Sequence, residues 1–434
     1  PFFEAKYVRT VVSGEDQPSF FTSVPGTLGG PAMRCDNAFL TAASLATLRT
    51  YGECANLATG TFSLARFNTD FGGRQFHAVR ETYRGVAGVT GNFNDDWNYE
   101  VAVNYGRFTS HGRNTNNLLL FDLDGNRAGF NLAVDAVRPT TGPNAGQIVC
   151  RVNAVTTTVP GCVPSNVFGQ GQPSAAALAF VHADGTTEEF ADQFVASVNL
   201  GGDLSQLFEL PGGPISFALG AEYREERASV DYDELTSSDG TFLNALQDFN
   251  PPKLTVKELY GEMQLPIFEN SSIGREFTVT LAGRMSDYNN ATGTVYAYNI
   301  QGIYAPIEDV RLRVAYATSV RAPTQGDLYS PQSQNFANGL GDPCDSNNIT
   351  GGPNRAANCA AAGVPTVANA ATVTACESTS FATTLGAPWR NCLALTSGTP
   401  FLSGGNPTLQ EERGRSLTIG AVIMPRGASC LGRA

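Results

Sequence analysis

Two alternating runs of residues, joined by the polar turn LPGGP within positions 193–226, constrain the fold of this chain more than any other feature. Apolar side chains recur at every second position, which places them on one face of a β-strand opposite polar residues. Each run is about ten residues long, whereas strands of soluble proteins average about five or six. About ten residues is the length with which a tilted strand crosses a bilayer. The apolar positions are Phe194, Ala196, Val198 and Leu200, then Ile215, Phe217, Leu219, Ala221 and Tyr223.

Similar runs occur along the chain and are connected alternately by short turns and long segments, which is typical of transmembrane barrels. We predict about twelve antiparallel strands, with boundaries good to a few residues. A short run at 61–67 is one of them, and glycines at Gly85 and Gly88 suggest a β-bulge. The long connections are expected at about 13–59, 114–187 and 322–411, with short helical patches in 37–51 and 174–180.

Aromatic residues stand at both ends of one apolar stripe in the run 97–105. Its members are Trp97, Tyr99, Val101, Val103 and Tyr105. Such a stripe is typical of the two interfacial girdles of a membrane barrel. A cross-strand aromatic ladder over a soluble core is the alternative.

Composition fits a barrel without requiring one. Charged residues make up 16%, Gly 46 positions and Phe 26, while the mean hydropathy is only −0.14. No apolar run reaches the length of a transmembrane helix. A secreted β-protein has a similar mix. The formal net charge of −12 argues against a nucleic-acid partner, because phosphate binding needs a basic patch.

The chain has nine cysteines, and eight of them form four couples that neighbour each other in sequence within expected loops. This pattern suggests local disulfides in an oxidising compartment, although sequence alone leaves the connectivity open. Cys430 is left over. The couples are Cys35 with Cys54, Cys150 with Cys162, Cys344 with Cys359, and Cys376 with Cys392.

Several segments together resemble one family, the TonB-dependent outer-membrane receptors. SVRAPTQGDLYSP (319–331) is similar to the family's Arg-Ala-Pro segment, and GGNPTLQEERGRSLTIG (404–420) to its later Asn-Pro signature. The strands FALGAEYREE (217–226) and VKELYGEMQLPI (256–267) look like its barrel strands. GCVPSNVFGQGQPS (161–174) resembles a loop of its larger, cysteine-containing members. The likeness extends from Phe2 to Pro425.

The resemblance implies an all-β, antiparallel transmembrane barrel with long extracellular loops, in the outer membrane of a Gram-negative cell. It implies a receptor that binds a scarce nutrient at those loops and imports it past a plug domain contacted by an inner-membrane energy transducer. The plug and the family's final strand are not found here, and the tail 426–434 is atypical. We therefore expect residues 1–425 to be a partial barrel from a longer protein, because the family's wall has about 22 strands.

Polar residues on the wet faces of the strands are the candidate lumen-facing positions. Glu222, Glu225 and Glu226 cluster with Arg224 and Arg227, and a rim charge network is favoured over a glycosidase-type carboxylate pair. Arg311, Arg313 and Arg321 share a face and could attract an anionic ligand, or they could pair with lumen carboxylates. The candidates are Glu222, Arg224, Glu258, Glu262, Arg311, Arg313 and Arg321.

No enzyme active site, metal site or cofactor site is predicted. Asp342, Asp345 and Asn347 look like part of a calcium loop, but the required spacing and the distal Glu are absent. Besides import, two other functions stay open. One is a secreted carbohydrate-active or adhesive β-protein, and the other is a passive porin.

Overall fold

A computed structural model describes residues 1–22, 33–62, 64–94, 96–243, 245–337, 341–377, 383–392 and 399–424. Ten strands of this part form one antiparallel sheet, in which each strand pairs with the next long strand along the chain. In sheet order they are β1 (Phe2–Glu15), β6 (Gln75–Phe93), β7 (Trp97–Leu118), β10 (His182–Asp203), β13 (Ser216–Tyr232), β14 (Leu254–Ser271), β15 (Gly274–Tyr288), β16 (Thr294–Ile307), β17 (Val310–Arg321) and β20 (Glu412–Ile423).

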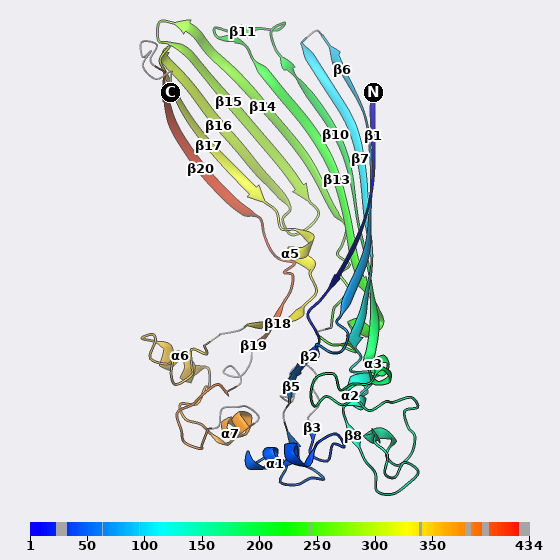
Figure 1. Ribbon diagram of the computed structural model, residues 1–434. Coiled ribbons are helices and arrows are strands. Elements are labelled where there is room, and N and C mark those ends of the chain that lie inside the picture. Colours follow the sequence, from blue (N-terminus) through cyan, green and yellow to red (C-terminus); the bar gives the residue numbers. More distant parts are fainter. Residues whose placement is uncertain are drawn as a thin grey trace, which may run out of the picture.

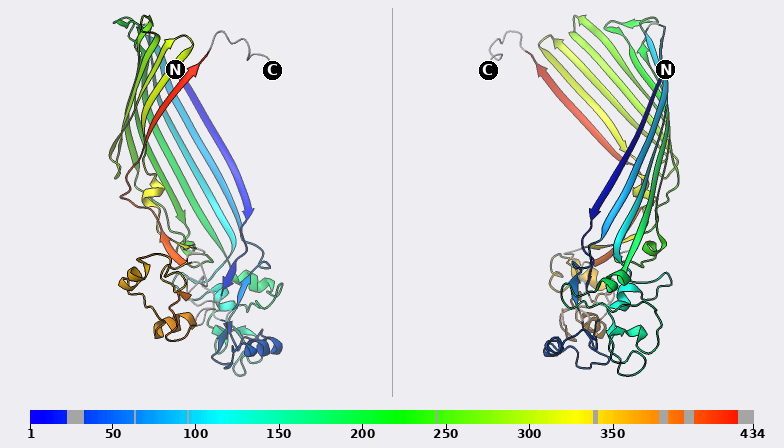
Figure 2. Two further views of the ribbon diagram at one scale, coloured as in Figure 1. Left: turned by 90° about the vertical axis from the view of Figure 1, so that its left-hand side faces the viewer. Right: turned by 45° about the vertical axis from the view of Figure 1, so that its right-hand side comes forward.

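The sheet is curved and open, with β1 and β20 at its two edges (Figures 1 and 2). Short connections join the strands at one end, which we call the turn end. The segments between β1 and β6, β7 and β10, and β17 and β20 all lie beyond the other end, which we call the loop end (Figure 1). Short turns at one end and long connections at the other are the asymmetry that the sequence predicts.

Shorter elements decorate the two ends of the sheet. The small strand pairs are β2 (Phe20–Thr22) with β5 (Ala65–Phe67), β3 (Met33–Arg34) with β4 (Thr61–Phe62), β8 (Ala136–Val137) with β9 (Val149–Cys150), β11 (Glu209–Leu210) with β12 (Gly213–Pro214), and β18 (Ser333–Ala337) with β19 (Thr399–Ser403). The helices are α1 (Ala42–Thr50), α2 (Gly129–Ala133), η1 (Arg151–Asn153), α3 (Ala175–Val181), α4 (Glu234–Ser237), α5 (Gln325–Tyr329), α6 (Arg355–Ala361) and α7 (Ala370–Glu377). Helices α1 and α3 lie in the two patches predicted to be helical.

The strand register separates the side chains into an apolar face and a polar face. Leu219 stands between Leu200 of β10 and Gly261 of β14, while Glu222 stands between Ser197 and Glu258. Large side chains on the apolar face stay open to the surroundings. Val198 is 49% exposed and Ile419 is 76% exposed. The sheet therefore does not bury its apolar face in a dry core of its own.

Aromatic side chains gather at both ends of the apolar face. At the turn end, the Trp97 ring centroid lies 5.5 Å from that of Phe93 and 4.9 Å from that of Phe217. Toward the loop end, Tyr7 and Tyr83 have centroids 5.0 Å apart. Rings at both borders of an apolar band are the arrangement found at the two interfaces of a membrane barrel.

Two local predictions were wrong. Residues 61–67 do not join the sheet, because Phe62 is buried in a core formed by the loops and the run splits into β4 and β5. No bulge occurs at Gly85 or Gly88, where β6 pairs without a shift on both sides. Gly88 instead leaves room for a ring, since a Cβ there would lie 2.4 Å from Phe2.

The register shifts instead near Ala183, between Pro266 and Phe268, and between Tyr304 and Ile307. The first long connection runs from 16 to 74 and is longer than predicted, because 61–67 lies outside the sheet and β6 begins only at Gln75. The second runs from 119 to 181 and is shorter than predicted, because β7 continues to Leu118 and β10 begins at His182. The tail 426–434 and Cys430 lie outside the described residues. Among the described residues, no helix is both long enough and apolar enough to cross a membrane.

A charge placed on the apolar face tests what that face contacts. Val198→Arg should lower the stability of the sheet in a bilayer by about 2–4 kcal/mol, because a lipid-facing arginine is costly near the membrane midplane. Ser197→Arg, one residue away on the polar face beside Glu222, should change it by less than about 0.5 kcal/mol. Urea titration of the chain folded in vesicles measures both. Equal effects at the two positions would contradict a lipid-facing apolar side.

Candidate functional site

The centre of the polar face carries a row of charges on β13. The Arg224 guanidinium lies 3.4 Å from the Glu222 carboxylate and 3.0 Å from that of Glu226. Gln193 of β10 donates a hydrogen bond to Glu226 at 2.9 Å. Residues two apart on a strand share a face, so this row follows directly from the strand period.

A second group on β14 and β15 continues this row. Glu258 is 7% exposed, and it accepts hydrogen bonds from the Ser286 hydroxyl at 2.5 Å and from Arg284 at 3.1 Å. Glu258 stands directly opposite Glu222. The two carboxylates therefore lie side by side, each with its own arginine. This places negative charge in a fixed position without leaving it unpaired.

Tyr260 organises the neighbouring part of the polar face. Its hydroxyl donates to the Asn199 side chain at 2.5 Å, and Arg284 lies 4.7 Å from the ring centroid. The ring covers Gly220, where a Cβ would come within 2.3 Å of it. Glycine is needed here because any side chain would displace the ring. Arg284 thus joins Tyr260 to Glu258 by a cation–π contact and an ion pair.

The remaining candidates on the polar face fall into two groups. Arg311 pairs with Glu276 at 2.6 Å near the turn end, and Arg321 pairs with Asp327 and Glu412 at the loop end. Glu262 and Arg313 share the polar face, and neither has an ion pair among the described residues. These two are free to meet a ligand or another part of the protein.

The cluster expected around Glu222 is divided between the two faces. Glu225 and Arg227 lie on the apolar face near the loop end, where Glu225 pairs with Arg227 at 2.6 Å and with Lys253 at 3.0 Å. Arg224, Glu222 and Glu226 remain on the polar face. The prediction of a single cluster is wrong because neighbouring residues of a strand point to opposite faces of the sheet.

Beyond the loop end, three connections pack into one unit that we call the loop body, comprising the described residues of 16–74, 119–181 and 233–253. The Leu120 backbone N–H donates a hydrogen bond to the Gly240 carbonyl at 2.8 Å, and the Phe20 ring packs edge to face against Phe242. The loop body holds the main buried apolar core of the described chain. Its largest buried members include Phe21, Met33, Phe71, Leu118, Phe130, Val134, Val167, Val181 and Phe242.

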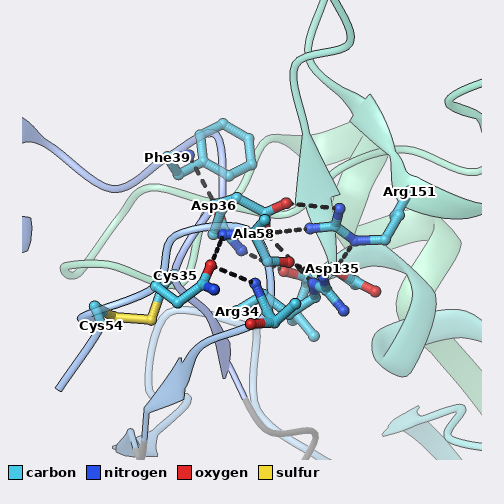
Figure 3. A network of polar contacts seen from close by, with 12 residues as sticks. Arg34, Cys35, Asp36, Phe39, Cys54, Ala58, Asp135 and Arg151 are labelled. Atoms are coloured by element: carbon cyan, nitrogen blue, oxygen red, sulfur yellow. Dashed lines mark hydrogen bonds and ion pairs between the residues drawn. A yellow bond between two sulfur atoms is a disulfide. The ribbon is translucent and has the colours of Figure 1, made fainter.

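Arg151 locks two parts of the loop body together (Figure 3). It makes two hydrogen bonds to Asp36, at 2.6 and 2.9 Å, and one to Asp135 at 2.9 Å. Burial works against its charge, yet the two carboxylates outweigh this and raise the pKa of Arg151. Arg34 also contacts Asp36, at 3.3 Å. Disulfides Cys35–Cys54 and Cys150–Cys162 close the two segments that this network joins.

The described parts of 322–411 form a second unit, the loop arm (Figure 1). The strands β18 and β19 pair to form the neck of the loop arm, near the sheet. Beyond the neck, disulfides Cys344–Cys359 and Cys376–Cys392 close two segments of the loop arm. At the base, Arg321 joins β17 to Asp327 of α5 and to Glu412 of β20. These eight cysteines form four disulfides, each between cysteines that follow one another in sequence, so each disulfide closes a segment of a single loop.

Asp345 is a buried acidic residue of the loop arm. Burial opposes its ionisation, but hydrogen bonds from the Asn347 and Asn391 backbone and from Arg390 outweigh this and lower its pKa. Arg390 lies 2.9 Å away. Asp342 is engaged by the Cys344 backbone at 2.7 Å. These two carboxylates therefore hold neighbouring segments of the loop arm together. No group of acidic, histidine or cysteine side chains arranged for a metal ion occurs in the described part of the chain.

Sequence reasoning missed Asn199, Tyr260, Arg284 and Gly220. Each lies on the polar side of a predicted strand, and their pairing depends on register across β10, β13, β14 and β15. A polar residue at every second position was the available signal. Nothing in one strand indicates which residue of the next strand it meets.

Removing Arg284 should leave the buried Glu258 carboxylate short of its cation. Arg284→Met should therefore cost about 1–3 kcal/mol of folding free energy, because a buried charged acceptor loses its partner. Arg313→Met is the matched control, with an expected change below about 0.5 kcal/mol. Urea midpoints of the two variants compare them directly. An equal loss would mean that the Arg284 contacts contribute nothing specific.

The Arg151 network should hold the loop body closed. We expect Arg151→Ala to lower the local opening free energy by about 1–2 kcal/mol, since it removes charge-assisted bonds that are partly exposed to water. Hydrogen exchange around Asp36 and Asp135 should rise while the sheet stays protected. Arg138→Ala is the control, because among the described residues the Arg138 side chain bonds to the Gly146 carbonyl of its own segment. Unchanged exchange in Arg151→Ala would contradict this role.

Acid should open the loop arm. Because the pKa of Asp345 is lower in the folded protein, its stabilisation is present above the unfolded value of about 4 and is lost as pH falls through the folded value. Trp389, whose carbonyl accepts from Ser346 at 3.0 Å, reports the change by fluorescence in a Trp97→Phe background. Asp345→Asn should flatten the acid transition. A transition of the same size in that variant would exclude Asp345 as its cause.

Comparison with known protein families identifies the family to which this sheet and its loops belong. The family model described as "TonB dependent receptor-like, beta-barrel" matches residues 42–429, well over half of the chain. No curated protein matches the chain. The matched stretch includes the loop body from residue 42 onward, the loop arm and all of the main strands except β1. The chain therefore belongs to the family of TonB-dependent receptor-like β-barrels.

Proposed function

We propose that this chain forms part of the wall and the extracellular binding surface of an outer-membrane receptor that imports a scarce nutrient, such as a siderophore or an oligosaccharide. The family consists of transport proteins of the Gram-negative outer membrane. The observation that carries the proposal is the two-faced sheet, whose large apolar side chains remain exposed along its strands. Residues 1–425 would be the barrel portion.

In this proposal the apolar face contacts lipid and the polar face lines the lumen. Glu222, Arg224, Glu258 and Glu262 would then border the path of the ligand, and Arg311 and Arg313 would border its periplasmic half. Most of these charged side chains form ion pairs with other residues of the wall, so the polar lining of the lumen would keep a fixed arrangement of charge. Glu262 and Arg313 would remain for contacts with cargo.

The loop body and the loop arm would supply the first contacts with the nutrient, through 114–187 and 322–411. The disulfides and Arg151 make these loops preformed, so less ordering is needed when a ligand binds. Disulfides persist in oxidising surroundings, which supports an extracellular position. The energy transducer of the inner membrane would act through a plug domain rather than through these residues.

Fractionation and ligand binding test the proposal. The full chain should sediment with outer membranes and need detergent for release. Cells displaying it should bind one ligand class from a panel of ferric siderophores and oligosaccharides. A variant with 341–392 replaced by a short Gly/Ser linker should keep the membrane location and lose that binding.

Other outcomes would redirect the assignment. Release into the medium without detergent would favour a secreted carbohydrate-active or adhesive protein. Conductance through membranes without saturable binding, and without dependence on the proton gradient, would favour a passive porin. Retained binding after removal of the loop arm would overturn its proposed role.

A further inference from the structure

His182 lies where the loop body joins the wall. It directly follows α3 and begins β10, and it pairs with Leu118 at the end of β7. The 119–181 connection therefore leaves and re-enters the sheet at this pair, beside α2 and α3 (Figure 1). Phe194 and Tyr223 pack together near the loop-side border of the apolar face. Since a strand rises about 3.3 Å per residue, His182 lies roughly 40 Å from Phe194 along β10, well outside the apolar band.

The imidazole ring of His182 packs against the apolar core of the loop body. Its centroid lies 6.5 Å from that of Phe71, with the rings edge to face, and the neighbouring Val181 and Leu118 are fully buried. The ring donates a hydrogen bond to the backbone carbonyl of Phe71. The Nε2 atom is buried and has no hydrogen-bond partner within the described parts of the chain. His182 therefore joins β10 to the 16–74 connection while one of its ring nitrogens stays unused.

Asp184 is the carboxylate that favours a protonated His182 from the side of the sheet. It is already paired with the Arg113 guanidinium of β7 at 2.7 Å. Helices α2 and α3 contain no charged residue. The positive charge of an imidazolium would thus receive little compensation from this side.

The other connections of the loop body bring cations and paired charges toward the same core. The Arg66 guanidinium pairs with Asp70 at 2.7 Å. Arg74, near Asp16, lies 5.3 Å from the centroid of an aromatic ring in the 233–253 connection. Burial therefore outweighs the attraction of nearby carboxylates and lowers the pKa of His182.

We propose that His182 is a pH-dependent switch, which keeps the loop body closed against the wall when it is neutral and opens it when it is protonated. The added proton binds Nε2, which then carries an N–H donor and a share of the positive charge inside an apolar core. Water satisfies both only after the 119–181 connection and the segment around Phe71 separate from the end of β10. This device is independent of which ligand the loops bind.

The pH range of the switch follows from the direction of the pKa shift. Because the pKa of His182 is lower in the folded protein, stability is full above the unfolded value of about 6.5 and is lost as pH falls below it through the folded value. Asp345 in the loop arm acts below the unfolded aspartate value of about 4. The two transitions are therefore separate.

Hydrogen exchange of the full chain, folded in vesicles, tests the switch at pH of about 7.5 and about 5, on either side of the ordinary histidine value. The Leu119 amide is the reporter, because it donates to the Val181 carbonyl at 2.9 Å beside His182. Its protection, corrected for the intrinsic exchange rate at each pH, should fall by roughly threefold or more at the lower pH, since one pKa unit changes the opening constant about tenfold. Amides of β15 should keep their protection.

The chain has three histidines, so each can be replaced in turn. His182→Phe removes the titrating group and keeps a ring against Phe71, so the pH dependence of Leu119 should disappear. His77→Gln and His111→Gln are matched controls at exposed positions and should behave like wild type.

Two results would overturn the switch. One is a pH dependence in His182→Phe equal to that of wild type, and the other is its loss in His111→Gln, which would assign it to the exposed His111–Glu188 pair. Should His182→Phe fail to fold, NMR titration of wild type with labelled histidine gives the answer directly. A His182 pKa at or above about 6.5 would then exclude the switch, because protonation would no longer oppose the closed state.

Discussion

Backbone hydrogen bonding between neighbouring strands is the constraint on which this structure depends. A chain in contact with lipid must satisfy its own N–H and C=O groups, and an antiparallel sheet does so along its whole length. Between neighbours, ten strands meet this requirement through continuous ladders with few register shifts, while the outer edges of β1 and β20 pair with no other strand of the described sheet. Once the ladder is fixed, the period of two assigns every side chain to one face. The polar cluster around Glu258 is a consequence of that assignment.

The loop body solves a different physical problem. Its connections leave the sheet, so they need a core of their own, and Phe21, Phe130 and Val134 supply it. Disulfides and the Arg151 network add constraints that the core alone would not give. Backbone pairing between strands stabilises the wall, whereas disulfides and ion pairs stabilise the loops.

Sequence patterns predicted the sheet well, because alternation over about ten residues is read within a single strand. The cysteine couples and two loop helices were also visible in the sequence. Contacts between strands were not, since Tyr260 meets Asn199 and Gly220 only in one register. Grouping Glu225 and Arg227 with Glu222 failed because neighbours in a strand point to opposite faces. The prediction that 61–67 forms a strand of the main sheet is wrong because Phe62 is buried in the core of the loop body.

The neck of the loop arm has an evolutionary consequence. The arm joins the wall through the β18–β19 pair and the contacts at α5, while its disulfides close within the arm itself. Such a segment can gain, lose or exchange residues without altering the order in which the strands pair. Diversification of this appendage can therefore proceed at a different pace from that of the wall that carries it.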